Sequence, residues 1–234
     1  YQLLHNIDGS DSQLVVESDF AGVTLDLPAP FGKSAAQKIP VAWRMSLAGR
    51  ERHMSLGYGQ LLELVAVSVP QEQGLRAGLM LGPGKASLPV SQGLRVDGRL
   101  GLVMAPEWWQ LLERGLSGAG QSDLPLLQQA SLTLGQVQGL PLELNDVQLK
   151  FVRDNEAGAW QLRLDAANLV GSLQKPAGDG PLQLSIERLR LPAAAGEPHK
   201  TEPEEATVAN WPWQLLPALS LELQQLYQAD ELLG

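Results

Sequence analysis

The side chains that could do acid–base, nucleophilic or metal chemistry lie far apart in this sequence. The histidines His5, His53 and His199 are widely separated, and none stands at a spacing that metal ligands use. Residues 6–11 (NIDGSD) gather several oxygen ligands but lack the alternation and closing Glu of an EF-hand loop, so an ordinary hairpin turn is the better interpretation. Residues 82–85 (GPGK) are interpreted as a turn, because a proline removes an amide donor where a phosphate loop needs one. We therefore predict no catalytic residue, no metal site and no cofactor, and we expect a protein that is not an enzyme.

The tryptophans leave two interpretations open. Trp211 and Trp213 flank a proline and could stack on a sugar, or they could anchor the chain to the core. Trp108 and Trp109 could enter a membrane interface, or they could pack against the open end of a sheet. Core or capping roles are favoured in both places, since a tryptophan often packs its ring while its N–H reaches a partner.

Composition excludes several classes of protein. The net charge of −9 argues against a nucleic-acid partner, because neutralising phosphates needs a basic patch. The sequence has no cysteine, which excludes disulfides and thiolate chemistry. No apolar run approaches the roughly 18–20 residues that span a bilayer. We expect this sequence to be a segment of a longer chain, whose membrane anchor would lie elsewhere.

Apolar residues recur at every second position along most of the sequence, which is typical of half-buried strands. Turn-forming residues such as Gly49, Gly158, 82–84 and 178–181 separate these stretches. Because parallel pairing needs a long crossover, short connections of this kind favour antiparallel neighbours. The sequence therefore predicts an all-β fold built on an antiparallel sheet.

Three stretches depart from the alternation. The spacing of apolar residues predicts a helix over about 106–116, and residues 123–129 could form a second short helix. Residues 193–210 are polar, contain Pro and Glu, and show no periodicity, which predicts a linker or loop. The expected organisation is a main β segment over 1–192, the linker, and a C-terminal strand region over 211–234 that continues the sheet.

Several predicted strands have one apolar and one polar face. Arg163, Asp165, Gln183 and Ser185 occupy the parity opposite to the leucines of their strands. A sheet of this kind must cover its apolar face with a second sheet, a helix or a ligand. If the cover is a lipid, the candidate groove residues are Leu162, Leu164, Leu182, Leu184, Ile186, Leu219, Leu221 and Leu223.

Short phrases along the sequence occur in the order found in a known family. Residues 18–22 (SDFAG), 27–30 (LPAP) and Lys33 form the first group, and 76–82 (RAGLMLG) and 93–98 (GLRVDG) follow. The remaining phrases are Leu88-Pro89, Trp108 or Trp109, 160–162 (WQL), 171–173 (GSL), 189–192 (LRLP) and 211–234. In this order they resemble an internal or C-terminal segment of the AsmA-like YhdP family of bacterial envelope proteins.

The resemblance implies a long, twisted, taco-shaped sheet with a hydrophobic groove. It implies a bridge-like lipid-transfer protein that is anchored in the inner membrane and extends across the periplasm towards the outer membrane. The expected partners are phospholipid and the adjoining segments of the same longer chain. Two alternatives stay open: a non-catalytic β-sandwich module that binds glycan or protein, and a structural spacer.

Overall fold

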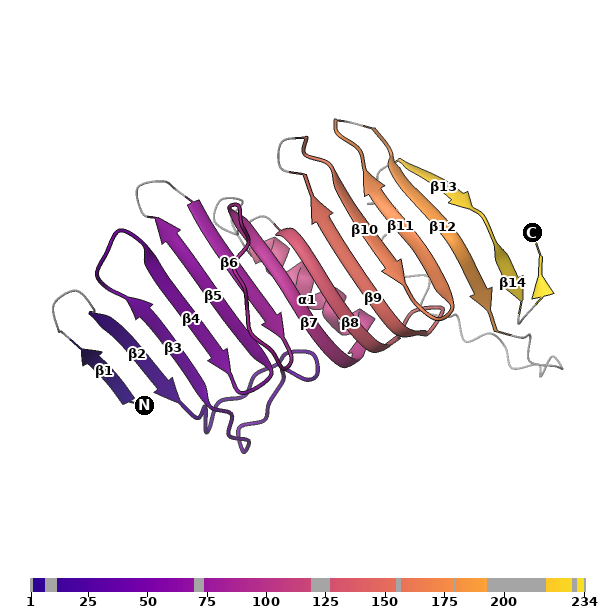
Figure 1. Ribbon diagram of the computed structural model, residues 1–234. Coiled ribbons are helices and arrows are strands. Elements are labelled where there is room, and N and C mark those ends of the chain that lie inside the picture. Colours follow the sequence, from indigo (N-terminus) through magenta and orange to yellow (C-terminus); the bar gives the residue numbers. More distant parts are fainter. Residues whose placement is uncertain are drawn as a thin grey trace.

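The computed structural model describes residues 2–6, 12–69, 74–118, 127–154, 157–178, 180–192, 218–228 and 231–233. All 15 strands of these ranges belong to one sheet, which Figure 1 shows as a long, twisted array. The first strands are β1 (Gln2–Asn6), β2 (Gln13–Ser18), β3 (Val41–Ser46), β4 (Arg52–Tyr58), β5 (Leu62–Val69), β6 (Gly74–Leu81) and β7 (Gly93–Met104). After the helix α1 (Ala105–Gly118) come β8 (Leu127–Gln138), β9 (Leu144–Arg153), β10 (Trp160–Asp165), β11 (Leu169–Lys175) and β12 (Leu182–Leu191). The last strands are β13 (Leu219–Leu223), β14 (Leu226–Gln228) and β15 (Glu231–Leu232).

Strands that are consecutive in sequence are neighbours in the sheet from β1 to β12. The all-β prediction is confirmed, but the sheet is mixed rather than antiparallel throughout. β7 runs parallel to both β6 and β8, and β12 runs parallel to β13 and β14. β7 is parallel to both neighbours because the two connections, residues 82–92 before it and the one with α1 after it, each return the chain to the end of the sheet where the previous strand began. A sequence pattern of short turns does not reveal such a return.

The crossover at residues 82–92 lies close against one face of the sheet. Gly78 makes this possible, since a Cβ there would lie 2.2 Å from the backbone oxygen of Ser87. Glu63 fixes the crossover, because its carboxylate accepts the amide of Ala86 at 2.7 Å and the ammonium of Lys85 at 3.0 Å. The Ala86 amide, and after it Lys85, lowers the pKa of Glu63 against the opposing effect of burial.

The predicted helix at about 106–116 is present as α1, which follows β7 directly. Pro106 lies in its first turn. Backbone N–H groups there have no intrahelical acceptor, so proline, which lacks an N–H, loses no hydrogen bond at this position. The second predicted helix is wrong for residues 127–129, which begin β8 and pair with β7. The rest of that helix, at 123–126, lies outside the described residues.

The main hydrophobic core forms where the helix and the loop between β2 and β3 meet the sheet. It contains Phe31, Leu81, Leu100, Val103, Leu134, Val137, Leu144, Val147 and Ala166, with Trp108 packed against it. Beyond β12, strands β13 and β14 continue the sheet side by side with the two ends of β12. The predicted linker at 193–210 lies outside the described residues.

Candidate functional site

One face of the sheet is apolar across nearly its whole length, and we call it the apolar face. The strand register places one residue of each strand from β2 to β13 in a single cross-strand row. The row consists of Val16, Trp43, Leu56, Leu64, Leu79, Val96, Ala130, Phe151, Leu162, Leu173, Leu184 and Leu221. Because side chains at every second position point the same way, this row and the parallel rows two residues away define one surface.

The opposite surface, the polar face, carries charges and hydroxyls at the intervening positions. Its cross-strand row is Glu17, Ala42, Gly57, Glu63, Met80, Asp97, Ser131, Lys150, Arg163, Ser172, Ser185 and Glu222. Ion pairs cross between strands here: Arg44 meets Glu17 at 2.9 Å, and Arg163 meets Glu187 at 2.8 Å. The pKa of Arg163 is raised, chiefly by its hydrogen bonds to Glu187. The sheet is therefore one-sided, as the alternation predicts.

All eight candidate groove residues lie on the apolar face. Leu162, Leu184 and Leu221 belong to the row already described. Leu164, Ile186 and Leu223 form the next row through Gly171, and Leu182 pairs with Leu219. Leu219, Leu221 and Leu223 are 45%, 62% and 45% exposed, whereas the five on β10 and β12 are half-buried. Their contact with lipid stays a prediction.

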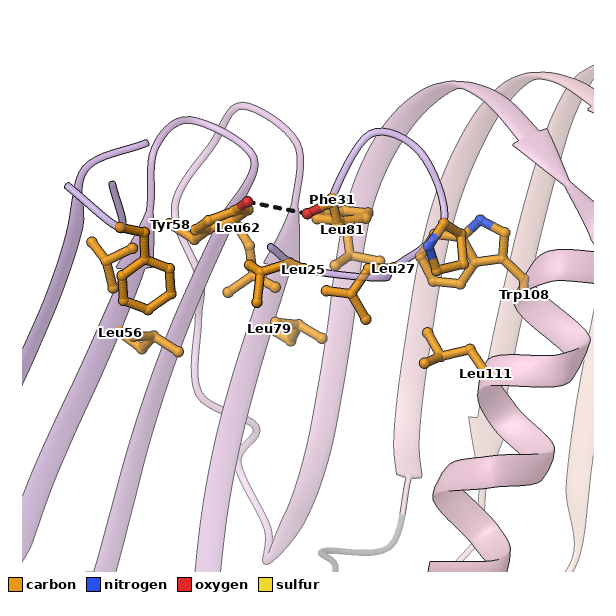
Figure 2. Close-up of a pocket in the computed structure, with 13 residues that line it drawn as sticks. Leu25, Leu27, Phe31, Leu56, Tyr58, Leu62, Leu79, Leu81, Trp108 and Leu111 are labelled. Carbon is orange, nitrogen blue, oxygen red and sulfur yellow. Dashed lines mark hydrogen bonds between the residues drawn. The ribbon is translucent and has the colours of Figure 1, made fainter. Parts of the chain in front are cut away.

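Residues 19–40, here called the covering loop, arch over the apolar face next to α1 and enclose a cavity of about 360 Å³ (Figure 2). The loop, the strands β3 to β6 and the helix all contribute to its lining. The lining residues are Phe20, Leu25, Leu27, Pro28, Phe31, Val41, Leu56, Tyr58, Leu62, Leu79, Leu81, Trp108 and Leu111. Apart from the Tyr58 hydroxyl and the Trp108 indole N–H, their side chains carry no polar group, so the cavity suits hydrocarbon.

Lys33 holds the covering loop together from inside. The residue is only 4% exposed, and its ammonium donates to the backbone oxygens of Phe20 at 2.8 Å, Ser34 at 3.0 Å, and Val23. The Lys33 backbone also pairs with that of Leu25 in both directions, at 2.9 and 3.1 Å. A buried ammonium is tolerated because these carbonyl dipoles replace its hydration.

Two contacts fasten the covering loop to its surroundings. The Tyr58 hydroxyl on β4 donates to the backbone oxygen of Phe31 at 3.1 Å, the bond drawn in Figure 2. The Phe31 ring meets Trp108 of α1 edge-on, with ring centroids 5.7 Å apart. Burial raises the pKa of Tyr58, so the hydroxyl stays neutral and keeps its proton for this bond. Trp108 therefore lines the cavity and packs against the core, which is the core role that its sequence favours over a membrane interface.

Metal-binding side chains do not cluster in the described part of the chain. This part includes no group of three or more His, Asp or Glu placed to hold a metal ion. His53 is exposed on β4, with its Nε2 3.3 Å from the Glu51 carboxylate, and Asp19 at the start of the covering loop has its pKa lowered, chiefly by the amide of Ala21. Within the described ranges, no helix has the length and hydropathy needed to cross a membrane. His199, most of the 6–11 turn, and Trp211 and Trp213 lie outside them.

The covering loop contains none of the eight candidate groove residues, so this part of the site was not predicted from the sequence. The sequence offers a signal only in retrospect: Leu25, Leu27 and Phe31 alternate with turn formers and precede a lone Lys33. An internal cage of backbone oxygens has no side-chain pattern of its own, so Lys33 looks like any surface lysine.

A single open sheet with one apolar and one polar face, partly roofed over a hydrocarbon-lined cavity, defines a β-groove protein. The chain belongs to the YhdP family: the family model described as "YhdP protein" matches residues 2–234. Comparison with curated proteins and with solved structures finds no match.

Proposed function

We propose that this chain is a segment of a lipid-transfer protein and that its apolar face holds the acyl chains of phospholipid. The observation that carries the proposal is the unbroken apolar row from β2 to β13, backed by a polar row on the other face. A sheet of this kind covers its apolar surface with a second sheet, helices or a ligand, yet every strand of the described residues lies in the same sheet. This arrangement argues against the β-sandwich alternative.

The physical basis of the proposed transfer is partitioning. Each buried methylene of an acyl chain gains about 0.8 kcal/mol relative to water. A continuous trough allows a chain to move from one strand to the next without meeting water at each step, so the transfer cost does not recur along the sheet. The role is non-catalytic, and the direction of flow would be set elsewhere.

The proposal extends to location on the strength of family membership. We place the chain in the periplasm, as part of a longer protein anchored in the inner membrane. The adjoining segments of that protein would continue the groove towards the two membranes.

Native mass spectrometry of the chain, purified without detergent, tests the proposal. We expect copurified phospholipid on the unmodified chain. Leu184→Asp places a carboxylate on the apolar face, where its desolvation is costly, and should reduce bound lipid several-fold while the sheet stays folded. Ser185→Asp on the same strand but on the polar face is the matched control and should keep the lipid.

Thermal stability is read on the same samples. An unmodified chain without lipid would contradict the proposal and favour a structural spacer. Unfolding of Leu184→Asp together with an unchanged Ser185→Asp variant would show that the apolar face is ordinary closed core, and it would contradict the groove as well.

A further inference from the structure

The apolar face ends at one margin in a row that carries positive charge. Arg153 on β9 pairs with Trp160 on β10, and Trp160 pairs with Lys175 on β11. Arg153 and Lys175 follow Phe151 and Leu173 by two positions, so they belong to the apolar face and not to the polar face. Three adjacent strands thus bring two cations and a tryptophan to the edge of the hydrocarbon surface.

These two cations differ from the arginines paired on the polar face. Arg44, Arg95 and Arg163 each meet a carboxylate within 3 Å. Neither Arg153 nor Lys175 has an ion-pair partner among the described residues.

Within the described residues, the surroundings of Arg153 supply no ion-pair partner for its charge. Its Nε is buried and lacks a hydrogen-bond partner within the described part of the chain. The neighbouring Asp154 is engaged in the turn, where its carboxylate accepts the amide of Ala157 at 3.1 Å. In a chain of net charge −9, an Arg and a Lys that lie on the same margin with no carboxylate of the described residues beside them call for an anionic partner.

Trp160 lies at the boundary between the hydrocarbon surface of the apolar face and its positively charged margin. Its ring lies 5.9 Å from that of Phe151, tilted by 34°, so its body packs with the apolar row. Trp side chains favour such boundaries, because one end is apolar and the other reaches polar groups. Strands lie about 4.8 Å apart, so Arg153 and Lys175 leave the sheet roughly 10 Å from each other across β10. Both side chains are long enough to converge above the Trp160 ring.

We propose that Arg153 and Lys175 bind the phosphate of a phospholipid headgroup whose acyl chains lie on the apolar row beginning at Phe151, Leu162 and Leu173. Arg offers a planar fork that matches two phosphate oxygens, and Lys adds a point charge. This inference rests on the proposed function, because it assigns the headgroup end of the same lipid. It predicts that the chain discriminates between lipids by their phosphate and not only by their hydrocarbon.

Two fluorescent probes with the same acyl chains isolate the phosphate: diacylglycerol and phosphatidic acid. The full 234-residue chain should bind phosphatidic acid about tenfold more tightly, the factor that corresponds to one charge-assisted contact. The double variant Arg153→Gln, Lys175→Gln should bind both probes equally, at the affinity of diacylglycerol. Lys150→Gln, which removes a charge from the polar face of β9, is the matched control and should keep the tenfold preference.

A charge-preserving variant separates the loss of positive charge from a general loss of folding. Arg153→Lys should retain most of the preference for phosphatidic acid, and a preference lost equally in Arg153→Lys and Arg153→Gln would overturn the electrostatic site. Equal binding of the two probes by the unmodified chain would overturn the headgroup site and leave the groove standing. Binding of neither probe would overturn both.

Glycerol 3-phosphate separates a lipid headgroup from a free phosphate ester. Having no acyl chains, it should fail to displace the phosphatidic acid probe at millimolar concentration. Displacement at micromolar concentration, lost in the double variant, would assign the site to a soluble phosphate ester and overturn its role in lipid binding.

Discussion

Replacing Lys33 by Met tests whether one buried ammonium organises the covering loop. Methionine keeps the length and most of the volume of the side chain but cannot donate to the backbone oxygens of Phe20, Val23 and Ser34. The oxygens of Phe20 and Ser34 keep backbone donors at 3.2 Å, the amides of Val23 and Gln37, so of the three only the Val23 oxygen loses its partner. A buried acceptor left without its donor costs about 1–3 kcal/mol. We therefore expect a net destabilisation of about 1–3 kcal/mol, concentrated in residues 19–40.

Two measurements read the outcome. The melting temperature should fall by roughly 2–12 °C, the range that this free energy gives for a chain of this size. Hydrogen exchange should accelerate at the amides of Gly22 and Leu25, whose hydrogen bonds depend on the loop. Lys38→Met is the matched control, because Lys38 is 72% exposed in its pair with Asp19 and exposed pairs contribute little. If Lys33→Met melts and exchanges like Lys38→Met, the ammonium does not hold the loop.

Three further changes test the packing and the crossover. Gly78→Ala should destabilise the chain by about 1–3 kcal/mol in chemical denaturation, because its Cβ would meet the crossover backbone, whereas Gly57→Ala meets nothing within 4 Å and should be neutral. Glu63→Gln should lower stability near neutral pH, and its deficit relative to the unmodified chain should shrink as pH falls from about 4.3 through the lowered pKa of Glu63; a deficit independent of pH would contradict the assigned role. Phe31→Ala should cost about 3 kcal/mol of unfolding free energy, while Val90→Ala, at a fully exposed position, should change nothing measurable.

Period-two alternation predicts which residues share a face, because parity is a local property of a strand. That is why Leu162, Leu184 and Leu221, far apart in sequence, meet in one cross-strand row. The same parity places Arg153 with Phe151, although the sequence alone does not say that Lys175 lies two strands away. Strand partners are non-local, so a pattern within one strand cannot select them.

Sequence patterns predict neither the parallel pairing of β7 nor the covering loop above the cavity, and the reason is related. The sequence of the crossover at 82–92 is typical of a turn, and the contacts of Gly78 with Ser87 and of Glu63 with Ala86 show that it returns over the sheet. The covering loop depends on Lys33 reaching carbonyl oxygens that every residue possesses. Because every residue has the same backbone oxygen, composition and periodicity cannot predict which of these oxygens will bind the lysine.

The parallel pairing of β7 with both neighbours has a consequence for the order in which the chain folds. From β1 to β6 and from β8 to β12, each strand pairs antiparallel with the strand next to it in sequence. Such hairpin contacts close short loops and form early, whereas parallel contacts wait for a longer closure. We therefore expect two meanders to assemble independently and β7 to join them last. The last part of the sheet to form is then its middle, where the main hydrophobic core of the finished molecule lies.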